Sequence, residues 1–261
     1  MMNIDRYVRV SSLSEASDIL RKDKAACILG GCGYLRLGRK KISTAIDLSL
    51  LSLSYITETP TTIEIGAMTP LRDIETSSLL ERTYGSALRK STEGIVGVQL
   101  RNVVTLGGTV AGRYPFSDIL PVLMALETNI HFAESGKISL EKYMTEKAIR
   151  DVVEKISIPK NGQKAGFASM RHSETDYAIL NAAVGIKNGD YKIFVGARPQ
   201  KAVRAPEAED VLNSGRSFED TGRAAAAELT FGDNTRGSAD YRKAICKAIV
   251  QRAGEEAINA V

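Results

Sequence analysis

The sequence has little of what several protein classes require. It contains no Trp, only 6% aromatic residues, and three cysteines among 261 residues, none of them in a CxxC pair. No stretch approaches the ~18 uncharged apolar residues that a transmembrane helix needs. Charged residues also interrupt the first thirty positions, where a signal peptide would need an apolar core. These features predict no membrane insertion and a cytoplasmic location.

The chain also lacks the concentrated basic charge of a nucleic-acid-binding protein. Its 35 Lys and Arg against 31 Asp and Glu give a formal net charge of +4, which is spread along the chain. The basic stretch Arg36–Lys41 is short, and nucleic-acid-binding surfaces usually combine dense positive charge with stacking aromatics. We therefore expect no nucleic-acid partner. The 43% hydrophobic and 25% charged residues are typical of a globular chain with a real core.

Metal ligands are too few for a zinc site or an iron–sulfur cluster. Cys27, Cys32 and Cys246 are odd in number, and the two histidines, His131 and His172, lie far apart in the sequence. Such sites generally take four ligands. We predict no metal site, and we expect His172, in a polar run, to be exposed. Redox chemistry would then require an organic cofactor held mainly by the backbone.

The chain divides into three parts, and the first covers residues 1–56. Ser14 is expected to cap a helix that includes Glu15–Leu20. Short strands are predicted at Ala25–Leu29, as a buried strand, and at Ile42–Leu48. A Thr-rich stretch over residues 57–62 marks the first boundary.

The second part, residues 57–159, mixes strands with short helices. Thr69 is expected as N-cap, with Pro70 as the first residue of a helix that covers Leu71–Glu75. The other predicted helices are Gly85–Ser91 and Leu120–Glu127. The predicted strands are Thr62–Ala67, Asn129–Phe132 and Val152–Ile158, the last closed by Pro159.

The third part, residues 160–261, begins at the boundary Pro159–Gly162. Strands at Tyr177–Ile186 and Tyr191–Ala197 flank Asn188-Gly189, which indicates a hairpin because this pair accepts positive φ angles. A helix is expected at the end of the chain and should pack on the hairpin sheet. The residues of this helix with 3–4 spacing are Tyr241, Ile245, Ala248, Ile249 and Arg252.

Two glycine-rich loops, Gly30-Gly31-Cys32-Gly33 and Thr105–Gly112, are the most informative features. Glycines let a backbone approach a ligand closely and point N–H groups at it, which suits a pyrophosphate. The alternative interpretation is that each loop is simply a tight turn into a helix. The first loop lacks the third glycine of the Rossmann fingerprint. The residues from Gly33 to Lys40 match the phosphate-loop motif in spacing only, because its Lys and its hydroxyl are missing.

Four motifs then follow one another along the chain. They are LGGCGYL at Leu29–Leu35, IGAMT at Ile65–Thr69, QLRNVVTLGG at Gln99–Gly108, and SDILPVLMAL at Ser117–Leu126. In this order and spacing they closely resemble the FAD-binding medium subunit of the molybdenum hydroxylases, the family of xanthine, carbon monoxide and nicotinate dehydrogenases. The Gln-x-Arg-Asn block is specific, whereas the first loop alone would be weak. The resemblance continues through Ile158-Pro159, Arg171 and the hairpin, and so covers nearly the whole chain.

The resemblance implies an α+β fold with three domains. Two small α/β subdomains, residues 1–56 and 57–159, would clasp FAD between them as in vanillyl-alcohol-oxidase (PCMH-type) flavoproteins. Residues 160–261 would form an α+β domain with an antiparallel sheet and helices, like the C-terminal domain of the carbon monoxide dehydrogenase flavoprotein.

The resemblance also implies a set of FAD-binding residues. Those expected at the pyrophosphate are Cys27, Ile28, Leu29, Gly30, Gly31, Cys32, Gly33 and Tyr34. Those of the second FAD loop are Val104, Thr105, Leu106, Gly107, Gly108 and Thr109. Ser117 and Asp118 would lie near the ribityl or isoalloxazine end and Val152 beside the adenine or flavin, and Thr69 and Phe167 match further cofactor positions. No residue is expected to act as acid or base, and Asp118 could instead cap the helix that follows it.

Three departures from the family pattern concern the flavin. Cys32-Gly33 stands where relatives usually carry Thr-Asp, Thr109 replaces an Asn, and Phe167 stands where many members have Lys. Backbone donors survive all three changes, so FAD binding is expected to persist.

The function implied by the resemblance is electron transfer. The chain would pass electrons from the 2Fe–2S clusters of a small partner subunit through FAD to NAD or another acceptor, beside a molybdopterin-binding large subunit. The alternatives are a flavin-free assembly subunit of such a complex and a stand-alone flavin oxidoreductase.

Overall fold

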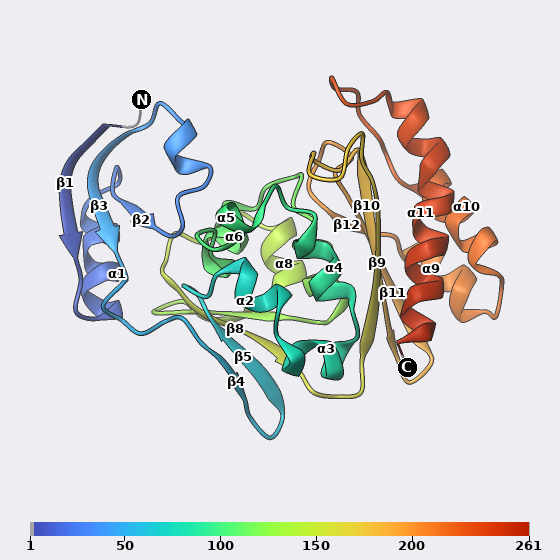
Figure 1. Ribbon diagram of the computed structural model, residues 1–261, viewed down its shortest axis with the longest axis horizontal. Coiled ribbons are helices and arrows are strands. Elements are labelled where there is room, and N and C mark those ends of the chain that lie inside the picture. Colours follow the sequence, from blue (N-terminus) through green and yellow to red (C-terminus); the bar gives the residue numbers. More distant parts are fainter. Residues whose placement is uncertain (1–2, 261) are drawn as a thin grey trace.

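The computed structural model describes residues 3–260, which form three parts in a row, with the middle part between the two others (Figure 1). The first part is a parallel sheet in the order β1-β3-β2, which pairs β1 (Asn3–Arg9) and β2 (Cys27–Leu29) with β3 (Lys41–Asp47). Helix α1 (Leu13–Lys22) connects β1 to β2, and a short 3₁₀ helix, η1 (Leu35–Leu37), follows the first glycine loop.

Two local predictions for this part are wrong. Ser12 rather than Ser14 caps α1, because the Ser12 hydroxyl accepts from the Glu15 N–H while the Glu15 carboxylate accepts from the Ser11 N–H. The strand expected from Ala25 begins only at Cys27 and is half-buried. Its predicted first residues lie in a turn, in which Asp23 accepts from the Ala25 N–H.

The middle part is a five-stranded antiparallel sheet with short helices above it. The strand order is β4-β5-β8-β6-β7. The strands are β4 (Ile56–Glu58), β5 (Thr62–Gly66), β6 (Asn129–Phe132), β7 (Gly136–Ser139) and β8 (Val153–Pro159). The helices are α2 (Leu71–Glu75), α3 (Ser78–Tyr84), α4 (Ala87–Glu93), α5 (Val98–Arg101), α6 (Leu106–Gly112), α7 (Ile119–Ala125) and α8 (Leu140–Thr145).

Helix boundaries in the middle part differ from the predictions for identifiable reasons. Pro70 rather than Thr69 is the N-cap of α2, because the buried Thr69 hydroxyl is hydrogen-bonded to both the N–H and the C=O of Tyr55. The helix expected over Gly85–Ser91 begins at Ala87, since Gly85, at φ 83°, terminates α3. Helix α7 ends at Ala125, before Glu127, which has φ 52°.

The third part is a four-stranded antiparallel sheet in the order β12-β11-β10-β9, with helices on one face. Its strands are β9 (Lys164–Met170), β10 (Leu180–Lys187), β11 (Asp190–Gly196) and β12 (Val203–Arg204), and its helices are α9 (Pro206–Asn213), α10 (Phe218–Glu228) and α11 (Ala239–Asn259). The predicted hairpin is confirmed as β10–β11, with Asn188 at φ 52° and Gly189 at φ 89°. Strand β9 was not predicted.

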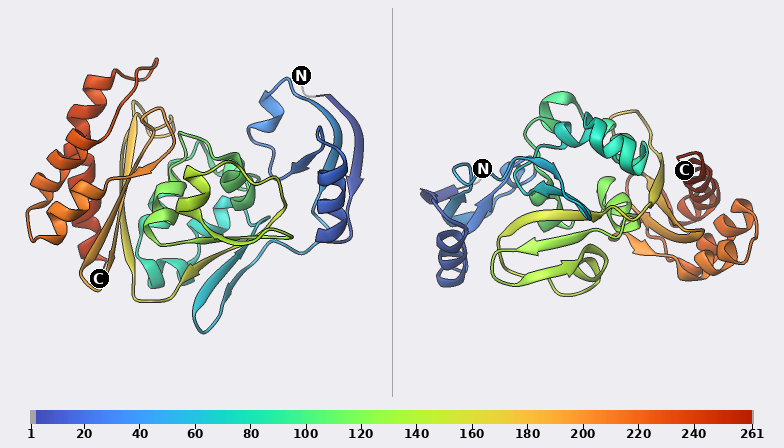
Figure 2. Two further views of the ribbon diagram at one scale, coloured as in Figure 1. Left: turned by 180° about the vertical axis from the view of Figure 1, so that it is seen from behind. Right: turned by 90° about the horizontal axis from the view of Figure 1, so that it is seen from below.

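Successive residues of this sheet face opposite sides. Ala183 and Phe194 belong to the core of the middle part, whereas Ala182 and Val195 belong to the core beneath α11. The sheet is therefore covered by the middle part on one face and by helices on the other, as Figure 2 shows.

Helix α11 packs on the sheet as expected, but the predicted spacing marks only part of its packing face, since Ile249 is fully buried and Ile245 packs against the same core. Tyr241 and Ala248 are exposed, while Arg242 and Cys246 are fully buried. The guanidinium of Arg242 donates to the carbonyl of Ile179 and to further backbone carbonyls. Hydropathy does not lead one to expect a buried arginine, so this residue of the packing face was missed. No helix within residues 3–260 is long and apolar enough to cross a membrane.

Candidate functional site

A cavity of about 330 Å³ lies where the three parts of the chain meet. Its walls come from the first glycine loop, from α5 to the start of α7, and from the loop between β9 and β10. Glycines and apolar side chains make up most of the lining. A pocket of this kind at the junction of several parts is the usual form of a cofactor site.

Most of the residues predicted to bind FAD line this one cavity. They are Cys27, Ile28, Gly30, Gly31, Cys32, Gly33, Tyr34, Val104, Thr105, Gly107, Gly108, Thr109, Ser117 and Asp118. The structure thus brings together two loops about seventy residues apart in the sequence.

Five predicted residues are placed elsewhere. Leu106 and Val152 are fully buried in hydrophobic cores, and Phe167 lies in the core between β9 and the middle part. Thr69 is buried and bonded to Tyr55, and Leu29 is paired with β3 at the end of β2. For all but Phe167, a neighbour in sequence lines the cavity although the residue itself does not.

The first loop presents unused backbone donors. Within residues 3–260, the N–H groups of Gly30–Tyr34 donate no hydrogen bond to another residue. Cys32 has φ 55°, a left-handed conformation of the kind found in anion-binding nests. This loop can therefore accept a pyrophosphate without a basic side chain.

The second loop differs from the first, because its backbone amides already donate hydrogen bonds within the protein. At the start of α6, the N–H of Leu106 donates to the Thr69 carbonyl and the N–H of Gly107 donates to the Ala67 carbonyl, at 2.9 and 2.8 Å. The Gly108 N–H is taken by the Thr105 hydroxyl. Since these amides are occupied, the second loop shapes the cavity and leaves phosphate binding to the first.

The two loops touch through a glycine. A Cβ added to Gly31 would lie 1.6 Å from the carbonyl oxygen of Val103, in the segment that leads into α6. Only a residue without a side chain allows this approach, which closes one wall of the cavity.

Four aromatic side chains gather at the cavity from all three parts of the chain. The ring centroids of Tyr34 and Tyr114 are 4.8 Å apart, and Tyr114 stacks on Phe116 at 5.2 Å. Phe116 lies 4.8 Å from Tyr177, and the Arg236 guanidinium lies over the Tyr177 ring at 4.7 Å. Such faces suit a flat, conjugated ring system.

A buried ion pair joins the middle and third parts at the cavity. Arg171 Nη2 donates to Asp118 Oδ2 at 2.8 Å, and Asn181 Nδ2 donates to Asp118 Oδ1 at 2.6 Å. Burial raises the pKa of Asp118, although Arg171 and Asn181 act to lower it. Asp118 stands at the N-cap position of α7, yet its carboxylate is bound to these two side chains, so it serves to join the two parts rather than to cap the helix.

Two side chains that depart from the family pattern, Cys32 and Thr109, donate hydrogen bonds to carbonyls within their own loops. The Cys32 thiol donates to the Gly30 carbonyl, and partial burial raises the pKa of Cys32. The Thr109 hydroxyl donates to the Thr105 carbonyl within α6. Neither side chain accepts a hydrogen bond from the backbone amides of the first loop, so these amides stay free.

Several cavity residues were missed by the sequence analysis. Tyr114 and Phe116 directly precede the Ser117-Asp118 motif, so their place in the sequence was a usable signal. The segments Gly94–Val96 and Thr175–Tyr177 carry no motif, and only folding brings them to the cavity.

Comparison with known proteins agrees with this geometry. The family model described as the FAD binding domain in molybdopterin dehydrogenase matches residues 2–161, and that of the CO dehydrogenase flavoprotein C-terminal domain matches residues 165–257. The nicotine 6-hydroxylase medium subunit of Paenarthrobacter nicotinovorans is 27% identical, covering 97% of this chain and 96% of that protein. The glyceraldehyde dehydrogenase medium chain of Sulfolobus acidocaldarius is 26% identical, covering 96% of this chain and 97% of that protein. The structure of reconstituted CO dehydrogenase from Oligotropha carboxidovorans has the same fold, with a TM-score of 0.88 and 24% identity over 99% of each chain.

Proposed function

The chain belongs to the family of FAD-binding medium subunits of molybdenum hydroxylases, and from this we propose that it transfers electrons between an iron–sulfur partner and a soluble acceptor. Its cofactor is FAD. The observation that carries the proposal is the cavity between the three parts. It is lined by free backbone N–H donors on one side and by aromatic rings on another.

The residues present fit FAD. The unpaired amides of Gly30–Tyr34 would hold the pyrophosphate, and the rings of Tyr114 and Phe116 would lie near the isoalloxazine. When bound, FAD supplies the exchange between one-electron and two-electron transfer. The chain itself binds and orients the cofactor and excludes water from it. Asp118 is held in an ion pair, and we assign no residue of the chain as acid or base.

The proposed partners follow from the relatives, which are named as medium subunits or medium chains. A molybdopterin-binding large subunit would oxidise the substrate, and 2Fe–2S clusters of a small subunit would deliver the electrons. The acceptor would be NAD or another carrier. The expected cytoplasmic location belongs to the same proposal.

The first test is the visible spectrum of the purified chain, before and after incubation with FAD and desalting. We expect flavin bands at about 375 and 450 nm, the ordinary positions of the isoalloxazine absorption. A chain that retains no flavin after reconstitution would contradict the cofactor role and favour a flavin-free assembly subunit.

The second test addresses electron transfer in the complex. The tagged chain would be co-expressed with its partner subunits, reduced anaerobically through the iron–sulfur subunit, and then mixed with NAD⁺. Loss of the flavin band on reduction and its return with NAD⁺ is the expected result. If the flavin is never reduced through the iron–sulfur subunit, the proposal is wrong. Turnover by the isolated chain alone would identify a stand-alone oxidoreductase.

A further inference from the structure

One wall of the cavity is held in a strained backbone conformation. Gly94, Ile95 and Val96 line the cavity between α4 and α5, and Val96 has φ 48°. Left-handed backbone is rare for a β-branched residue, and such conformations persist only where the surroundings enforce them. Something must therefore hold this segment in place.

Arg101 supplies that restraint from outside the cavity. Its Nη1 donates to the carbonyl oxygen of Ile95 at 3.1 Å, directly before the strained residue. The Arg101 side chain is 8% exposed and is not part of the cavity lining. Its hydrogen bond to the Ile95 carbonyl connects it directly to the Ile95–Val96 wall of the cavity.

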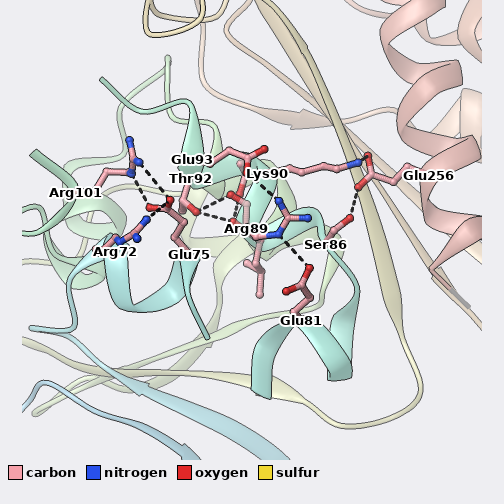
Figure 3. Close-up of polar contacts among 12 residues, drawn as sticks. Arg72, Glu75, Glu81, Ser86, Arg89, Lys90, Thr92, Glu93, Arg101 and Glu256 are labelled. Atoms are coloured by element: carbon pink, nitrogen blue, oxygen red, sulfur yellow. Dashed lines mark hydrogen bonds and ion pairs between the residues drawn. The ribbon is translucent and has the colours of Figure 1, made fainter. Parts of the chain in front are cut away.

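Arg101 is itself fixed by a buried carboxylate, as Figure 3 shows. Glu75, at the end of α2, accepts from Arg101 Nε at 2.6 Å and from Arg101 Nη2 at 3.2 Å. Arg72 also donates to Glu75. The planar fork of a guanidinium places two donors on a carboxylate and a third on a carbonyl, whereas the donors of a lysine all sit on one nitrogen and lack this fork.

We propose that Arg101 is a positioning residue of the FAD site, which holds the Ile95–Val96 wall against the cofactor while Glu75 holds Arg101. This inference rests on FAD binding in the cavity. It assigns a role to the arginine of the Gln-x-Arg-Asn motif, which does not reach the cavity itself.

The test is the FAD dissociation constant of Arg101→Lys, measured by equilibrium dialysis and set beside the unfolding temperature of the apo-protein. We expect FAD to bind about tenfold more weakly or worse, because a charge-assisted hydrogen bond to Ile95 is lost. The matched control is Arg89→Lys. Arg89 also bridges two carboxylates, Glu81 and Glu93 (Figure 3), but its side chain is more exposed and does not line the cavity. This control should bind FAD as the wild type does.

A rescue variant separates positioning from general stability. Glycine adopts φ 48° without strain, so adding Val96→Gly to Arg101→Lys should restore most of the lost affinity. Val96→Gly alone provides the reference, since Val96 also lines the cavity. A purely structural role for Arg101 predicts a lower unfolding temperature that Val96→Gly does not correct, with no change in the dissociation constant.

Glu75→Gln is the second variant in case Arg101→Lys does not fold. Its amide oxygen can still accept from Arg101, so we expect a smaller loss of FAD affinity than in Arg101→Lys. Wild-type affinity in both variants, or no rescue by Val96→Gly, would overturn the inference while leaving the proposed function intact. A wild-type chain that binds no FAD would instead overturn the cofactor role.

Discussion

At the residue scale, Gly31 of the first loop and Gly38, which follows that loop, differ in their surroundings. Gly31 packs directly on the Val103 carbonyl, whereas Gly38, after η1, has its nearest atom, the Leu35 oxygen, 3.3 Å from the position of an added Cβ. Both positions are glycine, and only the atoms around them differ. Gly31 is required by the contact between the two loops.

Gly31→Ala should therefore abolish FAD binding and lower the free energy of unfolding by about 1–3 kcal/mol, the usual cost of overpacking against a rigid neighbour. Flavin retention after desalting and urea unfolding measure the two effects. Gly38→Ala is the matched control and should retain FAD. Normal flavin content in Gly31→Ala would show that the two loops are not in close contact.

At the scale of elements, an ion-paired carboxylate joins the end of α7 to the β10–β11 hairpin. Glu127 accepts from Lys187 Nζ at 2.9 Å and from Lys192 Nζ at 2.6 Å. Partial burial raises the pKa of Glu127, but hydrogen bonds from the two lysines outweigh it and lower the pKa to about 2. The ionised form is thus favoured in the folded protein.

A lowered pKa means that Glu127 stabilises the fold above its ordinary pKa of 4.5, and that this contribution is lost as the pH falls from 4.5 to about 2. Glu127→Gln should lower the free energy of unfolding by about 1 kcal/mol at pH 7, since the pair is partly solvated. The difference from wild type should shrink toward zero near pH 2, as measured by urea unfolding at several pH values. Glu146→Gln, at an exposed pair with Lys142, should change little. A difference independent of pH would rule out the ion-pair explanation.

At the scale of the whole molecule, the cavity exists because three parts of the chain, each with its own sheet, meet. The sheets use residues 3–47, 56–159 and 164–204, and we propose domains 1–56, 57–159 and 160–261 on this basis. The Arg171–Asp118 pair ties the third part to the middle one at the cavity itself.

Arg171→Ala should lower the free energy of unfolding by about 3 kcal/mol, because it leaves the buried Asp118 carboxylate without its charge partner. Adding Asp118→Asn removes the unpaired charge and should recover part of the loss. Urea unfolding of the single and double variants measures this coupling. Strictly additive effects would show that the two side chains do not interact.

Much of this protein could be predicted from local sequence. The Asn188-Gly189 turn specifies its hairpin because the pair tolerates positive φ, and the glycine loops mark the cavity because only glycine permits such close backbone approach. The ordered motifs also predicted the family and FAD. The turn and the loops depend on residues close together in the chain, so their physics is visible in the sequence, whereas the family and FAD were predicted by resemblance.

Other features were decided only by the tertiary structure. Thr69 and Ser14 are of residue types that favour N-caps. However, the Thr69 hydroxyl is bound to Tyr55, and Ser12 takes the capping position. Arg242 is buried in the packing face of α11 despite its charge, and folding alone joins Arg171 to Asp118. Hydrogen bonds and burial between distant segments outweigh local preference at these sites. The sequence by itself therefore determined the kind of cofactor site, and the packing of the three parts decided which side chains complete it.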